Sequence, residues 1–156
     1  KKDDDKKDDD KKGDDKKGEA SGKDKGFDYE KAIRPDKESP PSTPGAILHV
    51  LVDGKHWLGF GYDGKADVVH DSSHILTPIK RNRGTNVVRY AKSADLVRAG
   101  FVWEESLKQL PEKAYLVHQP HGRGHVVAFA EDPNVRAFAD GLNLFLLNAV
   151  LLTAGR

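Results

Sequence analysis

Apolar residues are rare in the first 45 positions of the chain and then recur in short runs. The run Ala46–Val52 is almost wholly aliphatic and has the length of a strand, and the Asp53-Gly54 pair after it signals a turn. Shorter apolar runs predict further strands at residues 67–70, 86–90, 101–103, 114–118 and 125–130. The last two read as a hairpin, because the segment between them contains Gly122 and Gly124.

The clearest helical pattern lies at the C-terminus. Apolar residues recur there at every third or fourth position between Val135 and Leu152, which is the packing face of a helix that docks on a sheet. Asp132 is suited to cap this helix, Pro133 to occupy its first position, and Gly141 to divide it in two. A short helix is also predicted at residues 105–110, where Pro111 stops it.

These elements predict an α/β domain over residues 46–156, with a small mixed sheet and one or two C-terminal helices. Residues 1–45 precede it as a lead and a linker. Residues 1–25 contain ten lysines, nine aspartates and one glutamate, so almost no apolar surface offsets an ordering entropy of about 1–2 kcal/mol per residue. We expect a disordered lead, followed at residues 26–45 by a linker that three prolines near its end hold extended.

The composition excludes several classes of function. The formal net charge is +1, far from the footprint of a nucleic-acid-binding protein, and the basic loop at residues 80–83 lacks stacking aromatics. The sequence contains no cysteine, which excludes disulfides and a cysteine nucleophile. No apolar run is long enough to cross a membrane, and no signal peptide opens the chain. Because no methionine is present and the chain opens within a repeated charge pattern, we expect a fragment of a longer protein.

Histidine is the best candidate for chemistry, and the tightest group is His118, His121 and His125. Three imidazoles around one turn are possible zinc ligands. Against this, His118 and His125 lie in different predicted strands, and no carboxylate falls between them to complete the ligand set. We therefore assign no metal, cofactor or catalytic residue, and keep this group as a candidate for a metal-dependent enzyme. Neither His-x-x-Glu nor His-Glu-x-x-His occurs in the chain.

Two other motifs have structural explanations. Ser72-Ser73-His74 places a hydroxyl beside an imidazole, but neighbouring side chains on an extended segment point to opposite faces, and there is no Gly-x-Ser-x-Gly elbow. Residues 59–64 match Gly-x-Gly-x-x-Gly, but a predicted strand follows them in place of the helix that a phosphate site needs. Both read as turns.

The region from Pro44 onwards resembles the C-terminal domain of large bacterial zinc carboxypeptidase-like proteins, of the carboxypeptidase A-like metallopeptidase family. The segments that carry the resemblance are Pro44–Ile47, His56–Tyr62, Gly100–Trp103, Gly122–Ala130, Asp132–Arg136 and Leu144–Leu152. The resemblance implies part of a class I glutamine amidotransferase-like (flavodoxin-like) domain that follows the peptidase domain. It also implies a Lys/Asp-rich insertion before the Pro-Gly-Ala segment, as found here.

The resemblance implies a catalytically silent accessory domain. The family's zinc ligands and catalytic glutamate lie in the peptidase domain and match no position of this chain. Glutaminase chemistry needs a cysteine nucleophile, and the chain has none. The expected partner is the peptidase domain of the same polypeptide, in a secreted or periplasmic protein, and the sheet is expected to have an unpaired edge. We expect Arg136 to pair with Asp132 or with a strand-end carbonyl.

One further alternative is a stand-alone ligand- or protein-binding module. In that case Trp57, Tyr62 and Trp103 form a shallow ligand surface, whereas in an accessory domain they are core or rim aromatics. Burial of both tryptophans removes that surface.

Overall fold

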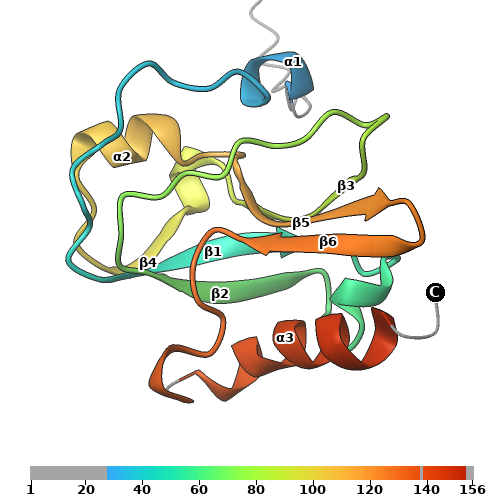
Figure 1. The fold of residues 1–156 in the computed structure, drawn as a ribbon. Coiled ribbons are helices and arrows are strands. Elements are labelled where there is room, and N and C mark those ends of the chain that lie inside the picture. The colour runs from blue at the N-terminus through green and yellow to red at the C-terminus, as the bar shows by residue number, and fades with distance from the viewer. Residues whose placement is uncertain (1–27, 138, 154–156) are drawn as a thin grey trace, which may run out of the picture.

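The computed structural model describes residues 28–137 and 139–153, so most of the expected disordered lead lies outside the described residues (Figure 1). The described strands are β1 (Ala46–Val52), β2 (Lys65–His70), β3 (Thr85–Tyr90), β4 (Val97–Gly100), β5 (Ala114–His121) and β6 (Gly124–Phe129). The helices are α1 (Tyr29–Ala32), α2 (Glu104–Gln109) and α3 (Asp140–Thr153), with 3-10 turns η1 (Trp57–Gly59), η2 (Ser93–Asp95) and η3 (Val135–Ala137). These elements confirm the expected α/β domain with a small sheet and a C-terminal helix.

The strands form one sheet in the order β2-β1-β3-β5-β6, and β4 also pairs with β1. β3 and β4 occupy the same edge of β1, where Tyr90 lies opposite Val50 and Gly100 lies opposite Ala46. They run in the same direction and act as one strand that the loop carrying η2 interrupts. Every pair among the described strands is antiparallel. The described sheet therefore has none of the parallel pairing of a flavodoxin-like fold.

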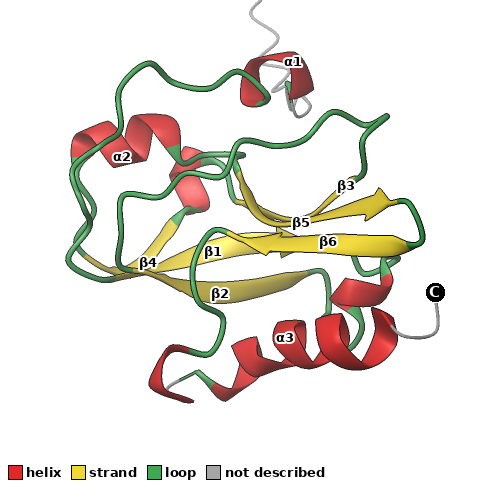
Figure 2. Cartoon of the chain, viewed as in Figure 1, coloured by secondary structure: helices red, strands yellow, loops and turns green. Residues whose placement is uncertain are grey.

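α3 crosses one face of the sheet, and α1 and α2 lie on the opposite side (Figure 2). Strand β1 shows why the core forms there, because Leu48 and Val50 are fully buried while Leu51 is 44% exposed. Phe145 of α3 is fully buried and stacks on Tyr62, with ring centroids 4.0 Å apart. Burying a phenylalanine of this kind stabilises the fold by about 1.5–3 kcal/mol.

Two predicted boundaries are wrong. The strand expected at residues 101–103 lies at β4, because Gly100 turns the chain with a φ of 86° and a Cβ there would lie 2.7 Å from the Gly45 carbonyl oxygen. The C-terminal helix begins at Asp140 and not at Pro133. Asp132 accepts a hydrogen bond from the Asn134 amide at 2.8 Å, but Arg136 then takes a φ of 51°, which ends the first turn. The break in the C-terminal helix that was expected at Gly141 therefore lies earlier, at Arg136.

The described part of the linker, residues 28–45, runs along the domain, and we call it the strap. Its first residues hold α1, where the Tyr29 hydroxyl donates to the Ile79 carbonyl and the Arg81 guanidinium lies 5.0 Å from the Tyr29 ring. Further along, the Gln109 side chain donates to the Glu38 carbonyl at 3.0 Å. Side chains of the domain thus fix the strap at several points.

Candidate functional site

Three histidines from distant parts of the chain form a continuous row of ring contacts. His56 Nε2 lies 3.0 Å from His118 Nδ1, and His118 Nε2 lies 2.9 Å from His125 Nδ1. His56 immediately precedes η1, His118 is on β5 and His125 is on β6. We call these three residues the histidine chain.

A backbone amide sets the tautomers of the histidine chain. The Leu58 amide donates to His56 Nδ1 at 3.2 Å, so neutral His56 carries its hydrogen on Nε2. His56 therefore donates to His118 Nδ1, and His118 in turn donates through Nε2 to His125 Nδ1. When all three rings are neutral, each carries its ring hydrogen on Nε2. The hydrogen on His125 Nε2 lies at the end of the series.

The indole of Trp57 packs against the histidine chain. Its ring centroid lies 5.3 Å from those of His56 and His118 and 6.3 Å from that of His125. Burial, and then the proximity of His125, lower the pKa of His118 below its ordinary value. Burial and the neighbouring imidazole therefore favour the neutral form of His118.

The structure brings together two of the three predicted metal candidates. His118 and His125 are in contact, whereas the exposed His121 lies at the hairpin turn, and the third member of the cluster is His56. His118 directs its two ring nitrogens to different neighbours, so one ion cannot bind all three rings through the observed contacts. Among residues 28–137 and 139–153, no group of three or more His, Cys, Asp or Glu is placed to hold a metal. The metal hypothesis stays a prediction without an assembled ligand set.

A second polar centre is built around the buried carboxylate of Glu131. His70 Nδ1 lies 2.6 Å from Glu131 Oε1 but outside the alignment of a hydrogen bond, and the two side chains are 1% and 5% exposed. The Ser72 hydroxyl donates to the same oxygen at 2.6 Å. His70 and Glu131 were not predicted as site residues, although an acidic residue directly after the strand predicted at residues 125–130 was a usable signal.

Two tyrosines lie in the electrostatic field of Glu131. The hydroxyls of Tyr90 and Tyr115 are buried and have no hydrogen-bond partner among the described residues. Burial raises the pKa of each phenol well above its ordinary value, and the charge of Glu131 adds to this. Both phenols are therefore neutral in the field of a buried carboxylate.

The serine motif at residues 72–74 has a structural role. Ser72 Oγ accepts from the His74 amide at 2.9 Å and donates to Glu131, so it closes a turn and ties it to β6. Ser72 and Glu131 line an open hollow together with Asp132 and Arg136. Arg136 is exposed and makes no ion pair or hydrogen bond within the described ranges, so the pairing expected for it is not found.

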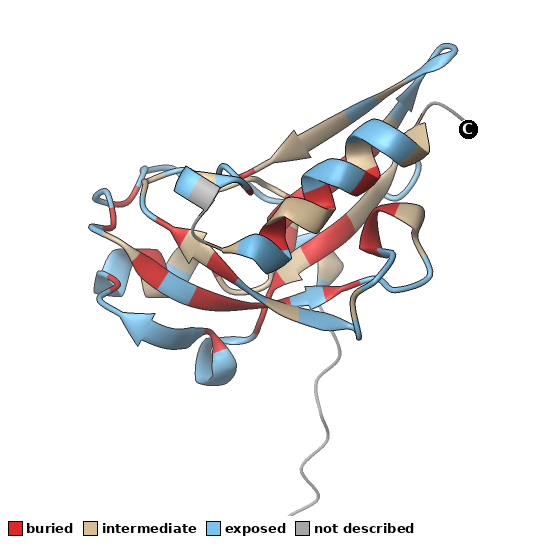
Figure 3. Ribbon diagram, turned by 90° about the horizontal axis from the view of Figure 1, so that it is seen from below, coloured by how far each residue is buried: buried red, intermediate tan, exposed pale blue. Residues whose placement is uncertain are grey.

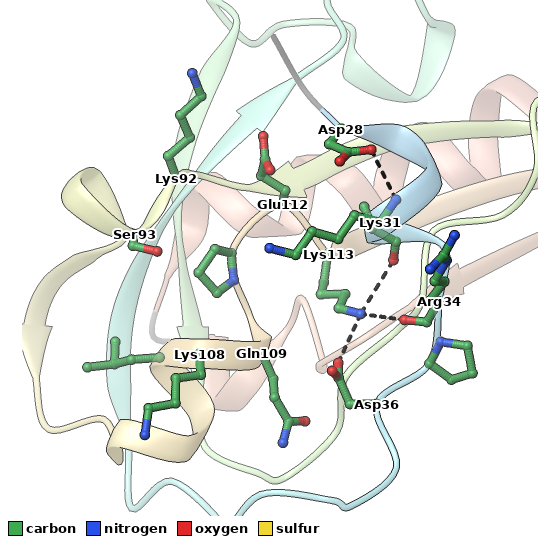
Figure 4. A pocket seen from close by; sticks show the side chains of 14 residues that line it. Asp28, Lys31, Arg34, Asp36, Lys92, Ser93, Lys108, Gln109, Glu112 and Lys113 are labelled. Carbon is green, nitrogen blue, oxygen red and sulfur yellow. Dashed lines mark hydrogen bonds and ion pairs between the residues drawn. The ribbon is translucent and has the colours of Figure 1, made fainter. Parts of the chain in front are cut away.

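A buried lysine anchors the strap and borders a cavity of about 650 Å³ (Figure 4). Lys113 is 6% exposed, and its Nζ donates to the Arg34 carbonyl at 2.8 Å and to the Ala32 carbonyl at 3.4 Å. The same Nζ lies 3.0 Å from the carboxylate of Asp36. A buried ammonium with three oxygen partners is well compensated. Lys113 therefore serves to hold the strap.

The outer face of α3 is exposed (Figure 3), and its exposed side chains beyond the first turn are apolar. Leu147, Val150 and Leu151 are 50%, 64% and 68% exposed, and no charged residue occurs between Gly141 and Thr153. We call these three residues the α3 surface. No helix in the described part of the chain has the length and apolar character needed to traverse a bilayer.

The three aromatics singled out in the sequence have different surroundings. Trp57 is partly buried against the histidine chain, and Tyr62 is partly buried on Phe145. Trp103 is 41% exposed and packs edge to face on Phe101, which is 52% exposed. The condition that removes a binding surface, burial of both tryptophans, is not met.

We compared the chain with family models, with curated proteins and with solved structures, and none of them matches it.

Proposed function

We propose that this chain is a non-catalytic accessory domain that packs through the α3 surface against the peptidase domain of a zinc carboxypeptidase-like protein. The single observation that carries this proposal is the apolar outer face of α3, since large exposed apolar patches mark surfaces that another protein or domain covers. The resemblance of residues 44–156 to carboxypeptidase-like proteins is the reason for proposing the peptidase domain as the part that covers the α3 surface. In this arrangement the parent protein hydrolyses C-terminal peptide bonds, and its location is secreted or periplasmic.

The zinc of such a protein belongs to the peptidase domain. This chain contains no His-x-x-Glu pair. In the histidine chain, the ring nitrogens that face each other are engaged in contacts between imidazoles. We therefore assign the chain a structural role, or a role in presenting or restricting the substrate, and no step of the hydrolysis.

The upstream reading frame and the whole protein test this proposal. We expect an upstream His-x-x-Glu pair with a later histidine, carboxypeptidase activity in the whole protein, and none in residues 1–156 with added zinc. In the whole protein, Leu147→Asp should separate one thermal unfolding transition into two. Val126→Asp is the matched control, because Val126 is also 50% exposed but lies on β6. An upstream frame without those ligands, or a Leu147→Asp protein that unfolds like the control, contradicts the proposal.

A stand-alone binding module is the second candidate, and the exposed pair of Phe101 and Trp103 favours it. Exposed aromatic faces are common contact surfaces in recognition. For this function the gene encodes no peptidase domain, and Trp103→Ala weakens binding of the partner at least about tenfold while Leu147→Asp leaves it unchanged. Equal effects of the two substitutions contradict it.

The third candidate, a metal-dependent enzyme using His118, His121 and His125, is tested by zinc titration of the chain and of its triple alanine variant. Unchanged affinity in the variant removes it.

A further inference from the structure

We propose that the histidine chain is a latch that one proton opens, and that the latch fixes η1 and, through η1, the position of α3. Acid then changes the conformation of this part of the domain. The latch acts whether or not α3 has a partner.

The neutral histidine chain has no free acceptor nitrogen in its three contacts. The Leu58 amide occupies His56 Nδ1, the His56 hydrogen occupies His118 Nδ1, and the His118 hydrogen occupies His125 Nδ1. Each Nε2 already carries a hydrogen. An added proton must therefore go to a nitrogen that already faces a donor.

Wherever the proton settles, one of the three contacts is lost. A proton on His125 Nδ1 faces the His118 hydrogen, and a proton on His118 Nδ1 faces the His56 hydrogen. If the hydrogens move along the row, His118 donates to both neighbours, but His56 then carries its hydrogen on Nδ1 and faces the Leu58 amide. Two hydrogens between the same pair of nitrogens repel, so that pair separates.

The surroundings offer the added charge little compensation. His118 and His125 make no ion pair with a carboxylate in the part of the chain that the structure describes. The charged and titratable residues of the segments next to the row lie in four parts of the chain. In the adjoining sequence they are Asp53 and Lys55 before η1, Arg83 before β3, His121 at the end of β5 and Arg123 in the hairpin turn, while α3 carries no charge after Asp140. Most of these groups are cationic or titrate to cations, and the Asp53 carboxylate accepts from the Lys55 amide.

Asn148 connects the latch to α3. His56 caps η1 through the Leu58 amide, and the carbonyls of Leu58 and Phe60 accept from Asn148 Nδ2 at 3.1 and 2.8 Å. Asn148 is a residue of α3 and is 4% exposed. Loss of the cap therefore loosens the turn whose two carbonyls hold this helix.

Trp57 reports on the latch, and Trp103→Phe makes it the only indole in the chain. Protonated imidazole quenches indole fluorescence, so we expect the Trp57 emission of that variant to fall between about pH 7 and pH 5. The midpoint should lie below 6.5, the ordinary value for histidine. A second substitution, His118→Asn, should move the midpoint of the curve, because it breaks both inner contacts while His56 and His125 stay near Trp57. His121→Asn, at an exposed histidine outside the row, should leave the midpoint unchanged. A midpoint that His118→Asn leaves in place, or that His121→Asn moves, overturns the latch.

Nitrogen-15 NMR of the unsubstituted chain tests the same proposal without any variant. Above pH 7.5 or so, His56 and His118 should carry hydrogen on Nε2 and none on Nδ1. As acid is added, the side-chain amide signal of Asn148 should move with the midpoint of the His118 ring. A hydrogen on His56 Nδ1 at high pH overturns the latch, and an Asn148 signal that does not move overturns its connection to α3.

Discussion

Histidine occurs in two different surroundings in this domain: beside the buried carboxylate of Glu131, and among other imidazoles in the histidine chain. In the first, His70 faces a carboxylate at 2.6 Å in the interior of the domain. In the second, His118 faces only other imidazoles, at 3.0 and 2.9 Å. A carboxylate gives a protonated imidazole an opposite charge, and a neutral imidazole does not. The contact with Glu131 therefore offers an opposite charge that the contacts within the histidine chain lack.

The two settings also differ in how they are held. The Glu131 centre joins the end of β2 to the residue after β6 and ties in the turn at Ser72. The histidine chain joins η1 to the hairpin of β5 and β6. The direction in which its imidazoles donate hydrogen bonds depends on the backbone amide of Leu58. We expect the first to contribute mainly to stability and the second mainly to the response to pH.

The largest expected effect comes from removing the carboxylate. Glu131→Ala leaves His70 and Ser72 without their shared partner in the interior and should lower the free energy of unfolding by about 3 kcal/mol. Urea unfolding monitored by circular dichroism measures this change. Glu105→Ala on exposed α2 is the control and should cost less than about 1 kcal/mol. Equal losses would mean that Glu131 is not the centre of a buried network.

The next effect comes from breaking the histidine chain. His118→Ala removes both inner contacts and part of the packing of Trp57, and should cost about 2 kcal/mol at neutral pH. His121→Ala, at the exposed hairpin turn, should cost less than about 0.5 kcal/mol. The comparison between the two centres fails if His118→Ala destabilises the chain more than Glu131→Ala does.

A smaller effect is the pH dependence of stability. The pKa of His118 is lowered in the folded chain, first by burial and then by His125. The unfolded chain therefore binds this proton more readily, so the contribution is complete above the ordinary value of 6.5 and is lost as the pH falls towards the pKa of the folded state. Unfolding free energies from about pH 7.5 to 5 should fall for the wild-type chain and fall less for His118→Asn. Parallel curves would assign the loss to other groups.

The smallest effect should come from Tyr90. Its hydroxyl is buried without a hydrogen-bond partner among the described residues, so Tyr90→Phe removes a desolvated group and no contact. We expect a change within about 0.5 kcal/mol in either direction. A loss above about 1.5 kcal/mol would reveal a water that links this hydroxyl to Glu131, which would enlarge the Glu131 centre.

Local patterns were enough to predict most of the sheet. The aliphatic run at Ala46–Val52 coincides with β1, and the runs at residues 67–70, 86–90, 114–118 and 125–130 fall in or overlap β2, β3, β5 and β6. The start of α3 was missed because Asp132 and Pro133 carry a helix-start signal that the left-handed backbone of Arg136 overrides. The backbone conformation of Arg136, which the residue types do not announce, sets that boundary.

The candidate site was only partly predictable from the sequence. His118 and His125 are seven residues apart, and the hairpin brings them together, as expected from the sequence. His56 lies 62 residues from His118, and Glu131 is 61 positions after His70, so only the folded sheet reveals these pairs. The resemblance to carboxypeptidase-like proteins, the peptidase partner and the secreted location stay predictions.

The strap gives the domain a form of mechanical protection. A pull on the chain at residue 28 first loads the contacts of Tyr29 and then the carbonyls and carboxylate that Lys113 holds. The contacts of Gln109 with Glu38 and of Trp103 with Ser42 follow before the load reaches β1, which begins at Ala46 and lies between β2 and β3. We therefore expect tension on the segment before residue 28 to detach the strap, including the contacts of Lys113, before it separates the strands of the sheet.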